Sequence, residues 1–447
     1  MKIPELLSPA GDLARLKVAL RYGADAVYIG GEILSMRAKA KNFTREEMQA
    51  GVEYAHGRGK RVYVAVNVCA HNADFATLDD YLMFLAHIAV DAILVSDVGV
   101  FARAQSVAPN IPLHISTQAN VTNFAAAGFW QKLGASRIVL ARELSLSEIA
   151  EIYEKTRAEI EVFTHGAMCM AYSGRCLISN FLNARDANRG ECSQPCRFSY
   201  TVTEEKTGAV FPIVQQNAQC EFLSPPAETA EQIPRIQGTG GTHIFNSKDL
   251  NMVAHLPQMI DAGVAALKIE GRMKTEYYVG AVTKIYREAL NDYAHNPADY
   301  AAKIPFYTAE LEKIGNRGYT TGFFFGKMTD EGHDYAGVNQ ATNQDFLGLI
   351  ESFDQETGLC LLEQRNKFSV GDKIEILRAN GENFTQHVEN LYDESGAKII
   401  SAPHPKQKLL LQTLQPVEKY DMVRRDTSNI RPVLYLKEGA SYSVCGN

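Results

Sequence analysis

The chain has 447 residues, of which 46% are hydrophobic and 22% are charged. This composition is typical of globular domains and excludes a collagen-like repeat, a long disordered chain or a membrane bundle. Lys and Arg number 45 against 52 Asp and Glu, for a formal net charge of −7, so no general attraction to phosphate or anionic lipid is expected. Any nucleic-acid site must therefore be a local basic patch.

The cysteine count and the N-terminus favour a reducing compartment. Eight cysteines in a chain of this length are too few for a disulfide framework. Residues 1–7 contain no hydrophobic region of a signal peptide, and no stretch approaches the roughly 18 uncharged apolar residues of a spanning helix. We therefore expect a cytoplasmic protein with no membrane partner.

Short apolar runs rich in β-branched residues alternate with amphipathic stretches from the N-terminus to about residue 294. Buried parallel strands have this continuous hydrophobic character, and each needs a helix that crosses to the next strand. The predicted strands are Glu5–Leu7, Ala26–Gly30, Val62–Asn67, Ala92–Asp97, Leu113–Thr117, Arg137–Ala141, Ile160–Thr164 and Ala266–Glu270. The predicted helices include Asp12–Tyr22, Thr44–His56, Thr77–Ala89, Thr122–Leu133, Ser147–Lys155 and Thr275–Ala294, and several begin with a residue suited to N-capping. Eight such units predict an α/β fold, a (β/α)8 TIM-like barrel, with a doubly wound open sheet as the competing fold.

Polar residues gather where the predicted strands end. Because the active sites of such barrels lie at the carboxyl ends of the strands, these residues are candidates for a site. For any one of them, a helix cap or a loop hydrogen bond is the alternative explanation. The residues are Asn67, Asp97, Gln118, Arg142, Glu143, His165, Glu270 and Arg272.

Two further segments extend the predicted barrel. About a hundred residues separate the seventh strand from the eighth, far more than a βα loop needs. From about Phe346 onward, short alternating runs separated by turn residues predict a small β-barrel. We expect a barrel domain over residues 1–335, with an insertion at about 166–242, and a C-terminal β-barrel domain over residues 345–440.

Four of the eight cysteines lie in a window of 28 residues within the insertion: Cys169, Cys176, Cys192 and Cys196. Thiolates that converge repel one another, so in a reducing compartment they persist mainly when a metal or cluster neutralises them. Four buried, unrelated cysteines are the alternative, but the flanking Gly, Arg, Ser and Asn suit a loop-bound site better than a core. Zinc sites favour pairs two to four residues apart, which Cys192 and Cys196 satisfy and Cys169 and Cys176 do not. An iron–sulfur cluster is therefore preferred over zinc.

A basic segment follows the second predicted strand. Between Met36 and Arg61 there are seven Lys or Arg and three Glu, a local excess of four positive charges. Its first part, residues 36–43, is expected on the active-site face, where it suits a polyanion or a carboxylate substrate. A solvated helix start is the alternative.

Common hydrolytic motifs are absent from the sequence. There is no His-Glu-x-x-His helix, no Gly-x-Ser-x-Gly turn and no phosphate-binding Gly-x-x-x-x-Gly-Lys-Ser/Thr loop. His165 lies four residues before Cys169, which suggests a Cys–His nucleophile pair, but a cysteine held in a cluster is not a free nucleophile. These absences weaken a hydrolase or nucleotide-hydrolysis hypothesis.

Several spaced motifs cover most of the chain: EVFTHGAMCMAYSGRCLISN at 161–180, MRAKAKNF at 36–43, NARDANRGECSQPCR at 183–197, IFNSKDL at 244–250, KIEGRMKTEYYV at 268–279 and NRGYTTGFFFG at 316–326. Together they closely resemble the collagenase-like peptidase family, peptidase family U32. Within the family, the length and the β-rich C-terminal segment resemble the branch that hydroxylates tRNA.

The resemblance implies a barrel domain and an oxygen-sensitive iron–sulfur cluster, expected as 4Fe-4S. It also implies oxygen-independent 5-hydroxylation of the wobble uridine of tRNA, with the hydroxyl group linked to prephenate. Cys169, Cys176 and Cys192 match the family's cysteines. The position of the fourth ligand varies in the family. Some relatives have a cysteine where this chain has Asn251, and others pair two cysteines as Cys192 and Cys196 are spaced here. We therefore prefer Cys196, with Cys220 as the reserve candidate.

The resemblance and the strand-end positions together suggest roles for the remaining candidates. His165, Glu270 and Arg272 are the expected catalytic residues, with His165 and Glu270 as acid or base. The expected substrate contacts are Arg37, Lys39, Asn67, Gln118, Arg142 and Tyr172, with the cations holding carboxylates or tRNA phosphates. Partners that deliver electrons or assemble the cluster are also expected. The rival hypotheses are a collagenase-like peptidase and a non-catalytic, zinc-stabilised RNA-binding protein.

Overall fold

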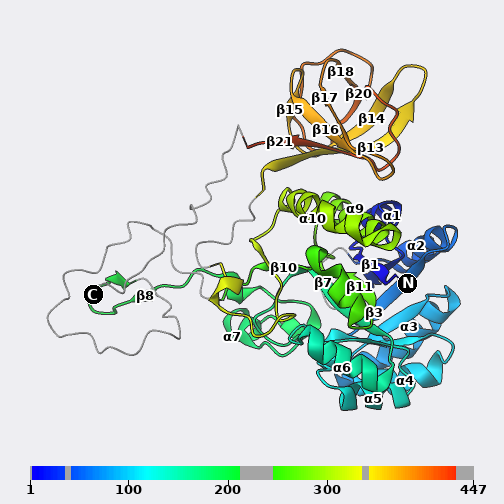
Figure 1. The fold of residues 1–447 in the computed structure, drawn as a ribbon, viewed down its shortest axis with the longest axis vertical. Coiled ribbons are helices and arrows are strands. Elements are labelled where there is room, and N and C mark those ends of the chain that lie inside the picture. The colour runs from blue at the N-terminus through cyan, green and yellow to red at the C-terminus, as the bar shows by residue number, and fades with distance from the viewer. Residues whose placement is uncertain (1–2, 36–41, 212–244, 335–341, 429–447) are drawn as a thin grey trace.

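Eight parallel strands close into a barrel in the computed structural model, which describes residues 3–35, 42–211, 245–334 and 342–428 (Figure 1). The first seven strands pair in chain order, and the eighth pairs with both the seventh and the first, which closes the sheet. The strands are β1 (Glu5–Pro9), β2 (Ala26–Gly30), β3 (Arg61–Val66), β4 (Ala92–Val95), β5 (Leu113–Ile115), β6 (Arg137–Val139), β7 (Ile160–Ala167) and β11 (Val264–Ile269). The predicted α/β barrel is confirmed, and the open-sheet alternative is wrong.

Helices cover the outside of the barrel and begin at residues that cap them. Asp12, Thr44, Ser145 and Thr275 each accept a backbone N–H of the first turn through a side-chain oxygen, which satisfies a donor that the helix leaves free. The helices are α1 (Leu13–Arg21), α2 (Arg45–His56), α3 (Phe75–His87), α4 (Val98–Val107), α5 (Phe124–Lys132), α6 (Leu146–Thr156), α8 (Leu256–Asp261), α9 (Glu276–His295) and α10 (Pro297–Glu312). No helix in the described ranges is long and apolar enough to cross a membrane.

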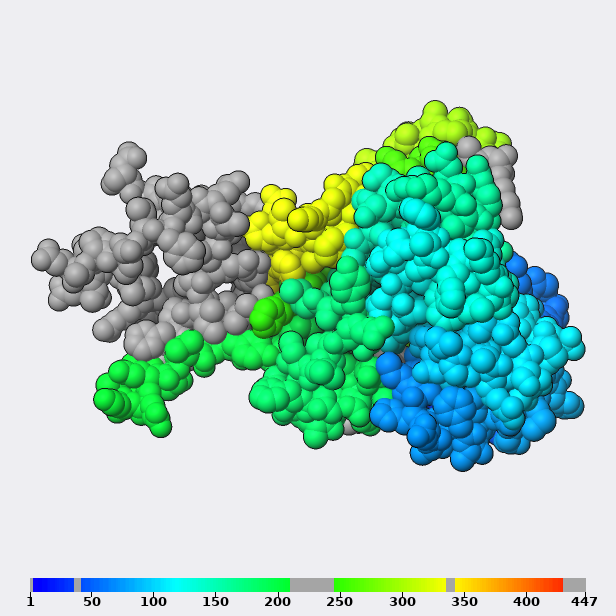
Figure 2. Space-filling view, turned by 90° about the horizontal axis from the view of Figure 1, so that it is seen from below, coloured from blue at the N-terminus to red at the C-terminus, as the bar shows by residue number. Residues whose placement is uncertain are grey.

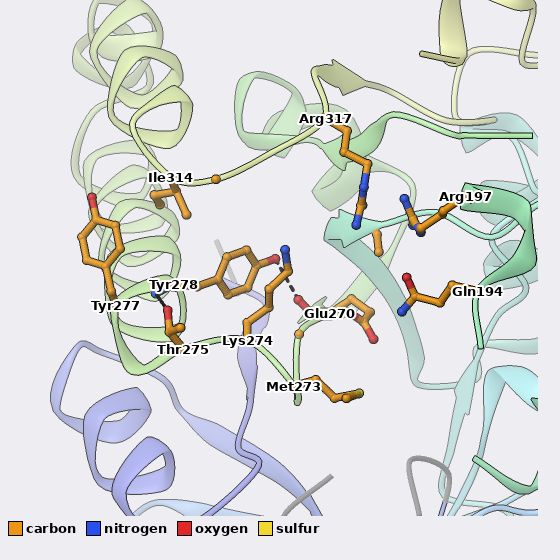
Figure 3. A pocket seen from close by; sticks show the side chains of 13 residues that line it. Gln194, Arg197, Glu270, Met273, Lys274, Thr275, Tyr277, Tyr278, Ile314 and Arg317 are labelled. Carbon is orange, nitrogen blue, oxygen red and sulfur yellow. Dashed lines mark hydrogen bonds between the residues drawn. The ribbon is translucent and has the colours of Figure 1, made fainter. Parts of the chain in front are cut away.

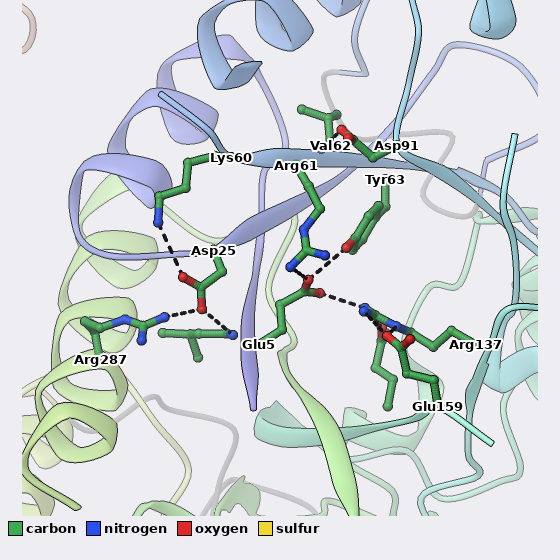
Figure 4. Close-up of polar contacts among 12 residues, drawn as sticks. Glu5, Asp25, Lys60, Arg61, Val62, Tyr63, Asp91, Arg137, Glu159 and Arg287 are labelled. Atoms are coloured by element: carbon green, nitrogen blue, oxygen red, sulfur yellow. Dashed lines mark hydrogen bonds and ion pairs between the residues drawn. The ribbon is translucent and has the colours of Figure 1, made fainter. Parts of the chain in front are cut away.

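Paired charges close the end of the barrel where the strands begin (Figure 4). The Tyr63 hydroxyl donates to Glu5 Oε2 at 2.9 Å, and Arg137 Nη1 donates to Glu5 Oε1 at 2.6 Å. Arg61 pairs with the same carboxylate. The Glu5–Arg137 pair is buried, so neutralised charges fill this end of the barrel, and the cavity described below lies at the other end, where the strands finish.

The insertion between β7 and α8 lies over that second end. It contains α7 (Ile178–Asn183), the short hairpin β8 (Val202–Thr203) and β9 (Val210–Phe211), and β10 (Asp249–Asn251). Strand β10 pairs antiparallel with the end of β7 and parallel with β12 (Tyr319–Thr320), so it ties the insertion to the barrel. Figure 2 shows the insertion in green between the yellow segment near residue 330 and the blue and cyan units of the barrel.

The C-terminal part is an antiparallel sheet domain, as expected. Seven of its strands form one sheet in the order β17-β16-β21-β13-β14-β20-β18, around a hydrophobic core of its own. It lies beside α9 and α10 (Figure 1), and the hydroxyl of Tyr22, the residue after α1, donates to Leu377 O at 2.9 Å. The strands are β13 (Gln344–Asp354), β14 (Leu359–Gln364), β15 (Phe368–Ser369), β16 (Lys373–Leu377), β17 (Phe384–His387), β18 (Leu391–Asp393), β19 (Ser401–Ala402), β20 (Lys408–Gln412) and β21 (Met422–Asp426).

Candidate active site at the mouth of the barrel

A cavity of about 190 Å³ lies at the carboxyl ends of the barrel strands, and we call it the cysteine cavity. Tyr28 of β2, Leu94 of β4, Phe163 of β7 and Lys268 of β11 line it from the barrel. The insertion supplies the opposite wall. This wall contains all four clustered cysteines, Cys169, Cys176, Cys192 and Cys196, so the fold brings the sequence cluster to the end of the barrel where active sites form.

Five of the predicted strand-end residues line the same cavity: Asn67, Gln118, Arg142, Glu270 and Arg272. Asn67 Nδ2 donates to Ser116 Oγ at 2.9 Å, which orients the amide. Gln118 Oε1 and Arg142 Nε are buried and have no hydrogen-bond partner among the described residues. Because buried polar atoms are normally satisfied, these two atoms are available to a bound substrate.

The two arginines of the cavity are held by packing. Arg142 Nη1 donates to Ala167 O at 3.0 Å, and its guanidinium lies over the Phe163 ring, 3.9 Å from the centroid. Arg272 is only 5% exposed, and its Nη1 donates to Ser35 Oγ at 2.9 Å. A Cβ atom at Gly30 would lie 2.0 Å from the same nitrogen, so the guanidinium fits only because β2 ends in glycine.

A bidentate ion pair between Arg189 and Asp74 attaches the insertion to the barrel. Arg189 Nη1 and Nη2 lie 2.8 and 2.9 Å from the two carboxylate oxygens of Asp74. Hydrogen bonds from Arg189 hold the pKa of Asp74 down, at about 2. Arg189 also donates to Cys69 O at 3.0 Å. The segment that carries Cys192 is thereby held against the loop after β3.

The four thiols form one electrostatic group. Burial raises the pKa of Cys196 to about 11, with Arg197 opposing the rise and the neighbouring thiolates of Cys169, Cys192 and Cys176 adding to it. The backbone N–H of Gln194 donates to Cys192 Sγ at 3.3 Å. Four thiols with backbone and arginine donors beside them are a donor set that fits an iron–sulfur cluster.

A single-ion site is not formed by these side chains. Within the described residues, no three of His, Cys, Asp and Glu are gathered closely enough to hold one metal ion. Four sulfurs around zinc, each at about 2.3 Å, must lie within about 4 Å of one another. In a cluster each thiolate binds a different iron, so the sulfurs of the ligands lie farther apart.

A second cavity, of about 420 Å³, adjoins the cysteine cavity and shares Glu270 with it (Figure 3). Its lining includes Arg197, Lys274 and Arg317, and we call it the basic cavity. Lys274 and Arg317 were not among the sequence-based candidates, and neither was Lys268. The signal for Lys268 was available, because a lysine stands inside the apolar run that forms β11.

The structure places the other predicted residues elsewhere. His165 is 1% exposed, lines neither cavity, and lies among the rings of Tyr278, Tyr286 and Tyr319. Tyr172 is 47% exposed on the insertion, although its neighbours in sequence line the cysteine cavity. The roles given to these two residues stay predictions.

Two further strand-end candidates, Asp97 and Glu143, line neither cavity. Asp97 caps α4 by accepting the Val100 N–H at 3.0 Å, the alternative considered for it. Burial raises the pKa of Glu143, which lines neither cavity. Arg37, Lys39 and the reserve ligand Cys220 lie outside the described residues.

A (β/α)8 barrel with thiols and cations lining a cavity at the carboxyl ends of its strands has the architecture of barrel proteins whose active sites form at that end. The chain belongs to peptidase family U32. The model of that family matches residues 11–334, and the model of the family's C-terminal domain matches residues 342–424.

Two relatives match nearly the whole chain. The tRNA hydroxylation protein P1 of Bacillus subtilis (strain 168) is 39% identical over 424 residues, which cover 95% of each chain. The tRNA hydroxylation protein P of Escherichia coli (strain K12) is 40% identical over 451 residues, which cover 95% of this chain and 97% of the relative. A 23S rRNA 5-hydroxycytidine synthase of Escherichia coli (strain K12) is 35% identical over 333 residues, 73% of this chain and 46% of its own.

Proposed function

We propose that the chain hydroxylates tRNA and forms 5-hydroxyuridine at the wobble position. The observation that carries the proposal is the identity of 39% and 40%, over 95% of the chain, to two proteins named for tRNA hydroxylation. The relative named for 5-hydroxycytidine synthesis supports the same type of reaction, because its product also carries a hydroxyl group at carbon 5 of a pyrimidine.

The proposed cofactor is an iron–sulfur cluster of the 4Fe-4S type, held by Cys169, Cys176, Cys192 and Cys196. The support is that these four thiols line one cavity. A cluster bound there would supply one-electron redox chemistry beside the substrate. The proposed hydroxyl donor is prephenate, with no need for molecular oxygen, as the family resemblance implies.

The polar wall of the cysteine cavity suits the edge of a uracil base. Uracil presents an N–H donor between two carbonyl acceptors. Gln118 Oε1 is buried without a hydrogen-bond partner in the described chain, and so is Arg142 Nε. In the proposed complex Gln118 accepts the N–H and Arg142 donates to a carbonyl, which would orient carbon 5 toward the reacting groups.

The proposed acid or base at the site is Glu270, since it lies between the two cavities and lines both. His165 lies behind it, and the Glu270 N–H donates to His165 O at 2.9 Å. Burial lowers the pKa of His165 to about 3, which keeps the imidazole neutral. We assign His165 a positioning role through the backbone of Glu270.

tRNA would approach through its anticodon loop, whose bases can be splayed out into a pocket. The exposed ring of Tyr172, on the insertion beside the cysteine cavity, is the proposed stacking partner. Because the chain carries a net charge of −7, binding of tRNA is expected to depend on local cations and to weaken as salt is raised.

The reaction is tested by analysis of tRNA nucleosides. A strain that lacks this chain and any parallel pathway should lose 5-hydroxyuridine, and the chain supplied in trans should restore it. The proposal is wrong if the nucleoside level is unchanged by both steps. Peptide cleavage by purified protein that survives removal of the metal would instead support the peptidase alternative.

The cofactor is tested by iron and sulfide analysis of protein purified without oxygen. Cys196→Ala should lower iron content severalfold, whereas Cys360→Ala should not, because Cys360 is buried in β14 of the C-terminal domain. If Cys196→Ala retains iron and Cys220→Ala loses it, the fourth ligand is Cys220. Stoichiometric zinc without iron would overturn the cluster and favour the zinc-stabilised alternative.

A further inference from the structure

The basic cavity brings three cations together from segments far apart in the sequence. Arg197 ends the short turn that carries Cys196, Lys274 follows β11, and Arg317 lies between α10 and β12. Figure 3 shows their side chains converging beside Glu270 and Tyr278.

The cations are not fully neutralised by their neighbours. Arg317 Nη1 lies 2.7 Å from Asp249 Oδ1, but Arg317 Nε is buried and makes no hydrogen bond with any described residue. Lys274 Nζ is likewise buried, with no hydrogen-bond partner in the part of the chain that the structure describes. Its ammonium group lies 5.0 Å from the centroid of the Tyr278 ring.

Like charges in a buried place cost free energy unless an anion joins them. Burial lowers the pKa of Lys274, Asp249 opposes that shift, and Arg317 adds to it. Asp249 and Glu270 supply two negative charges against the three cations, and Asp249 is already engaged by Arg317. A bound anion would provide the missing acceptors.

The dipole of the last long barrel helix acts in the same direction. Helix α9 is 20 residues long, and Thr275 at its N-cap lines the basic cavity. The N-terminus of a helix carries partial positive charge and favours an anion nearby. The helix and the three side chains therefore all attract negative charge to one space.

We propose that the basic cavity binds a small dicarboxylate, with Arg197, Lys274 and Arg317 as its cationic ligands. The cavity of about 420 Å³ has the size of sites for small molecules. Two arginines suit paired recognition of carboxylate oxygens, and the lysine adds a point charge. Because the cavity shares Glu270 with the cysteine cavity, the bound acid lies next to the proposed base site.

Burial distinguishes this ligand from a phosphate of the tRNA backbone. The side chain of Arg317 is 8% exposed, and Lys274 Nζ is buried. Phosphate contacts with a nucleic acid are made mainly by cations that project from the surface. Cations recessed in a cavity are reached more readily by a small molecule.

The inference rests on the proposed function in one respect, namely that the dicarboxylate is the hydroxyl donor. The probes are therefore prephenate and, independently of that function, succinate. Binding is measured by calorimetry on the full-length protein without oxygen, and it needs no turnover. Loss of tRNA hydroxylation alone would thus count against the proposed function and not against the cavity.

Lys274→Met is the variant that tests the site most directly. It removes one cation, and because Lys274 Nζ has no hydrogen-bond partner among the described residues, no other protein group loses a hydrogen bond. It should weaken binding of prephenate by roughly tenfold or more, since a hydrogen bond to a charged group is lost. Lys274→Arg should restore most of the affinity. Lys327→Met is the matched control, because Lys327 is exposed and lines neither cavity, and binding should be unchanged.

Thermal unfolding gives a second measurement that does not depend on catalysis. Prephenate should raise the melting temperature of the wild-type protein by mass action and leave that of Lys274→Met nearly unchanged. The proposal is overturned if neither acid binds the wild-type protein, or if both bind Lys274→Met as well as wild type. It is also overturned if Lys274→Met weakens tRNA binding and its salt dependence while binding of the acids is unaffected, since the cations would then serve the RNA backbone.

Discussion

Lys268 Nζ lies 2.7 Å from Glu161 Oε1 inside the barrel, and the two side chains are 4% and 0% exposed. Burial lowers the pKa of Lys268. Burial also opposes ionisation of Glu161, but Lys268 and Arg137 hold the pKa of that carboxyl below its usual range. Since Lys268 lines the cysteine cavity, this ion pair fixes a positive charge at the inner end of the site.

Glu161→Gln should be more damaging than Lys268→Met. Loss of the carboxylate leaves Lys268 buried without its partner, which costs about 3–5 kcal/mol. Loss of the lysine leaves Glu161 with Arg137 Nη1 at 3.1 Å, so the cost should be smaller. The double variant should be more stable than Glu161→Gln alone, because no charge is then stranded.

Urea unfolding followed by circular dichroism measures these differences. The matched control is Glu151→Gln, because Glu151 pairs with Lys155 at 2.7 Å on the surface, where both side chains are about half exposed. That change should cost less than about 1 kcal/mol. Equal costs for Glu161→Gln and Glu151→Gln would refute the role of burial.

The barrel could be predicted from the sequence because its strands are buried on both faces. Runs such as 62–66 and 92–95 are almost wholly apolar, so their pattern is unmistakable, and helix caps such as Thr44 mark where the next helix begins. The grouping of Cys169 to Cys196 was also visible, because those cysteines are close in sequence.

The basic cavity and the anchoring of the insertion could not be predicted in the same way. Arg189 and Asp74 are 115 residues apart, and Arg197, Lys274 and Arg317 come from three loops. The periodicity of hydrophobic residues along the sequence does not predict contacts between such distant residues, since these contacts depend on how the insertion packs on the barrel. His165 shows a different limit, because its place at the end of a strand suggested a catalytic group, whereas its ring lies among those of three tyrosines and its role stays a prediction.

Loss of the Arg189–Asp74 pair should loosen the insertion while the barrel stays folded. Arg189→Lys keeps the positive charge, but a lysine cannot form the bidentate ion pair with Asp74. Iron content after purification without oxygen should fall, because Cys192 and Cys196 lie a few residues beyond the anchor. The unfolding midpoint in urea should change little, since the pair is partly exposed.

The control for this variant is Arg103→Lys. Arg103 also contacts an aspartate, Asp79, through Nε and a second guanidinium nitrogen, but on the exposed surface of α3 and α4. Iron content should be unaffected there. Retention of iron by Arg189→Lys, or an equal loss in Arg103→Lys, would show that the anchor does not organise the cysteines.

Stability should fall in acid because two buried histidines stay neutral in the folded state. Burial lowers the pKa of His114 and of His165 to about 3, from an ordinary value of 6.5. Below pH 6.5 the unfolded chain takes up protons that the folded chain cannot, so the free energy of unfolding decreases as the pH falls toward 3. Each histidine should contribute a slope of about 1.4 kcal/mol per pH unit in that window.

Urea unfolding at a series of pH values checks this dependence. His165→Gln should be less stable near neutral pH, because a packed ring is lost, but its stability should fall less steeply in acid. His404→Gln is the matched control, since His404 is exposed on the C-terminal domain, and its slope should equal that of wild type. An unchanged slope in His165→Gln would contradict the prediction.

Arg424 joins the C-terminal domain to the barrel. It is fully buried in β21, and its Nη2 lies 2.9 Å from Glu375 Oε1 of the same domain and 2.7 Å from Glu310 Oε2 of α10. Arg424 Nη1 also donates to the Tyr277 hydroxyl of α9 at 3.2 Å. Removal of the guanidinium leaves Glu375 without an ion-pair partner among the described residues and leaves Glu310 with Lys313 alone, so Arg424→Met should cost about 3–5 kcal/mol.

The shape of the urea unfolding curve tests whether Arg424→Met weakens the junction between the barrel and the C-terminal domain. In wild type the two parts should unfold together, whereas in Arg424→Met the C-terminal domain should unfold first and give a separate step in urea. Arg425→Met is the matched control, because Arg425 contacts Asp345 and Asp372 within the C-terminal domain alone. It should shift the curve slightly and keep a single step. A single, unshifted transition in Arg424→Met would mean that other contacts across the junction, such as the Tyr22–Leu377 hydrogen bond and the stacking of Tyr277 on Phe346, hold the two parts together.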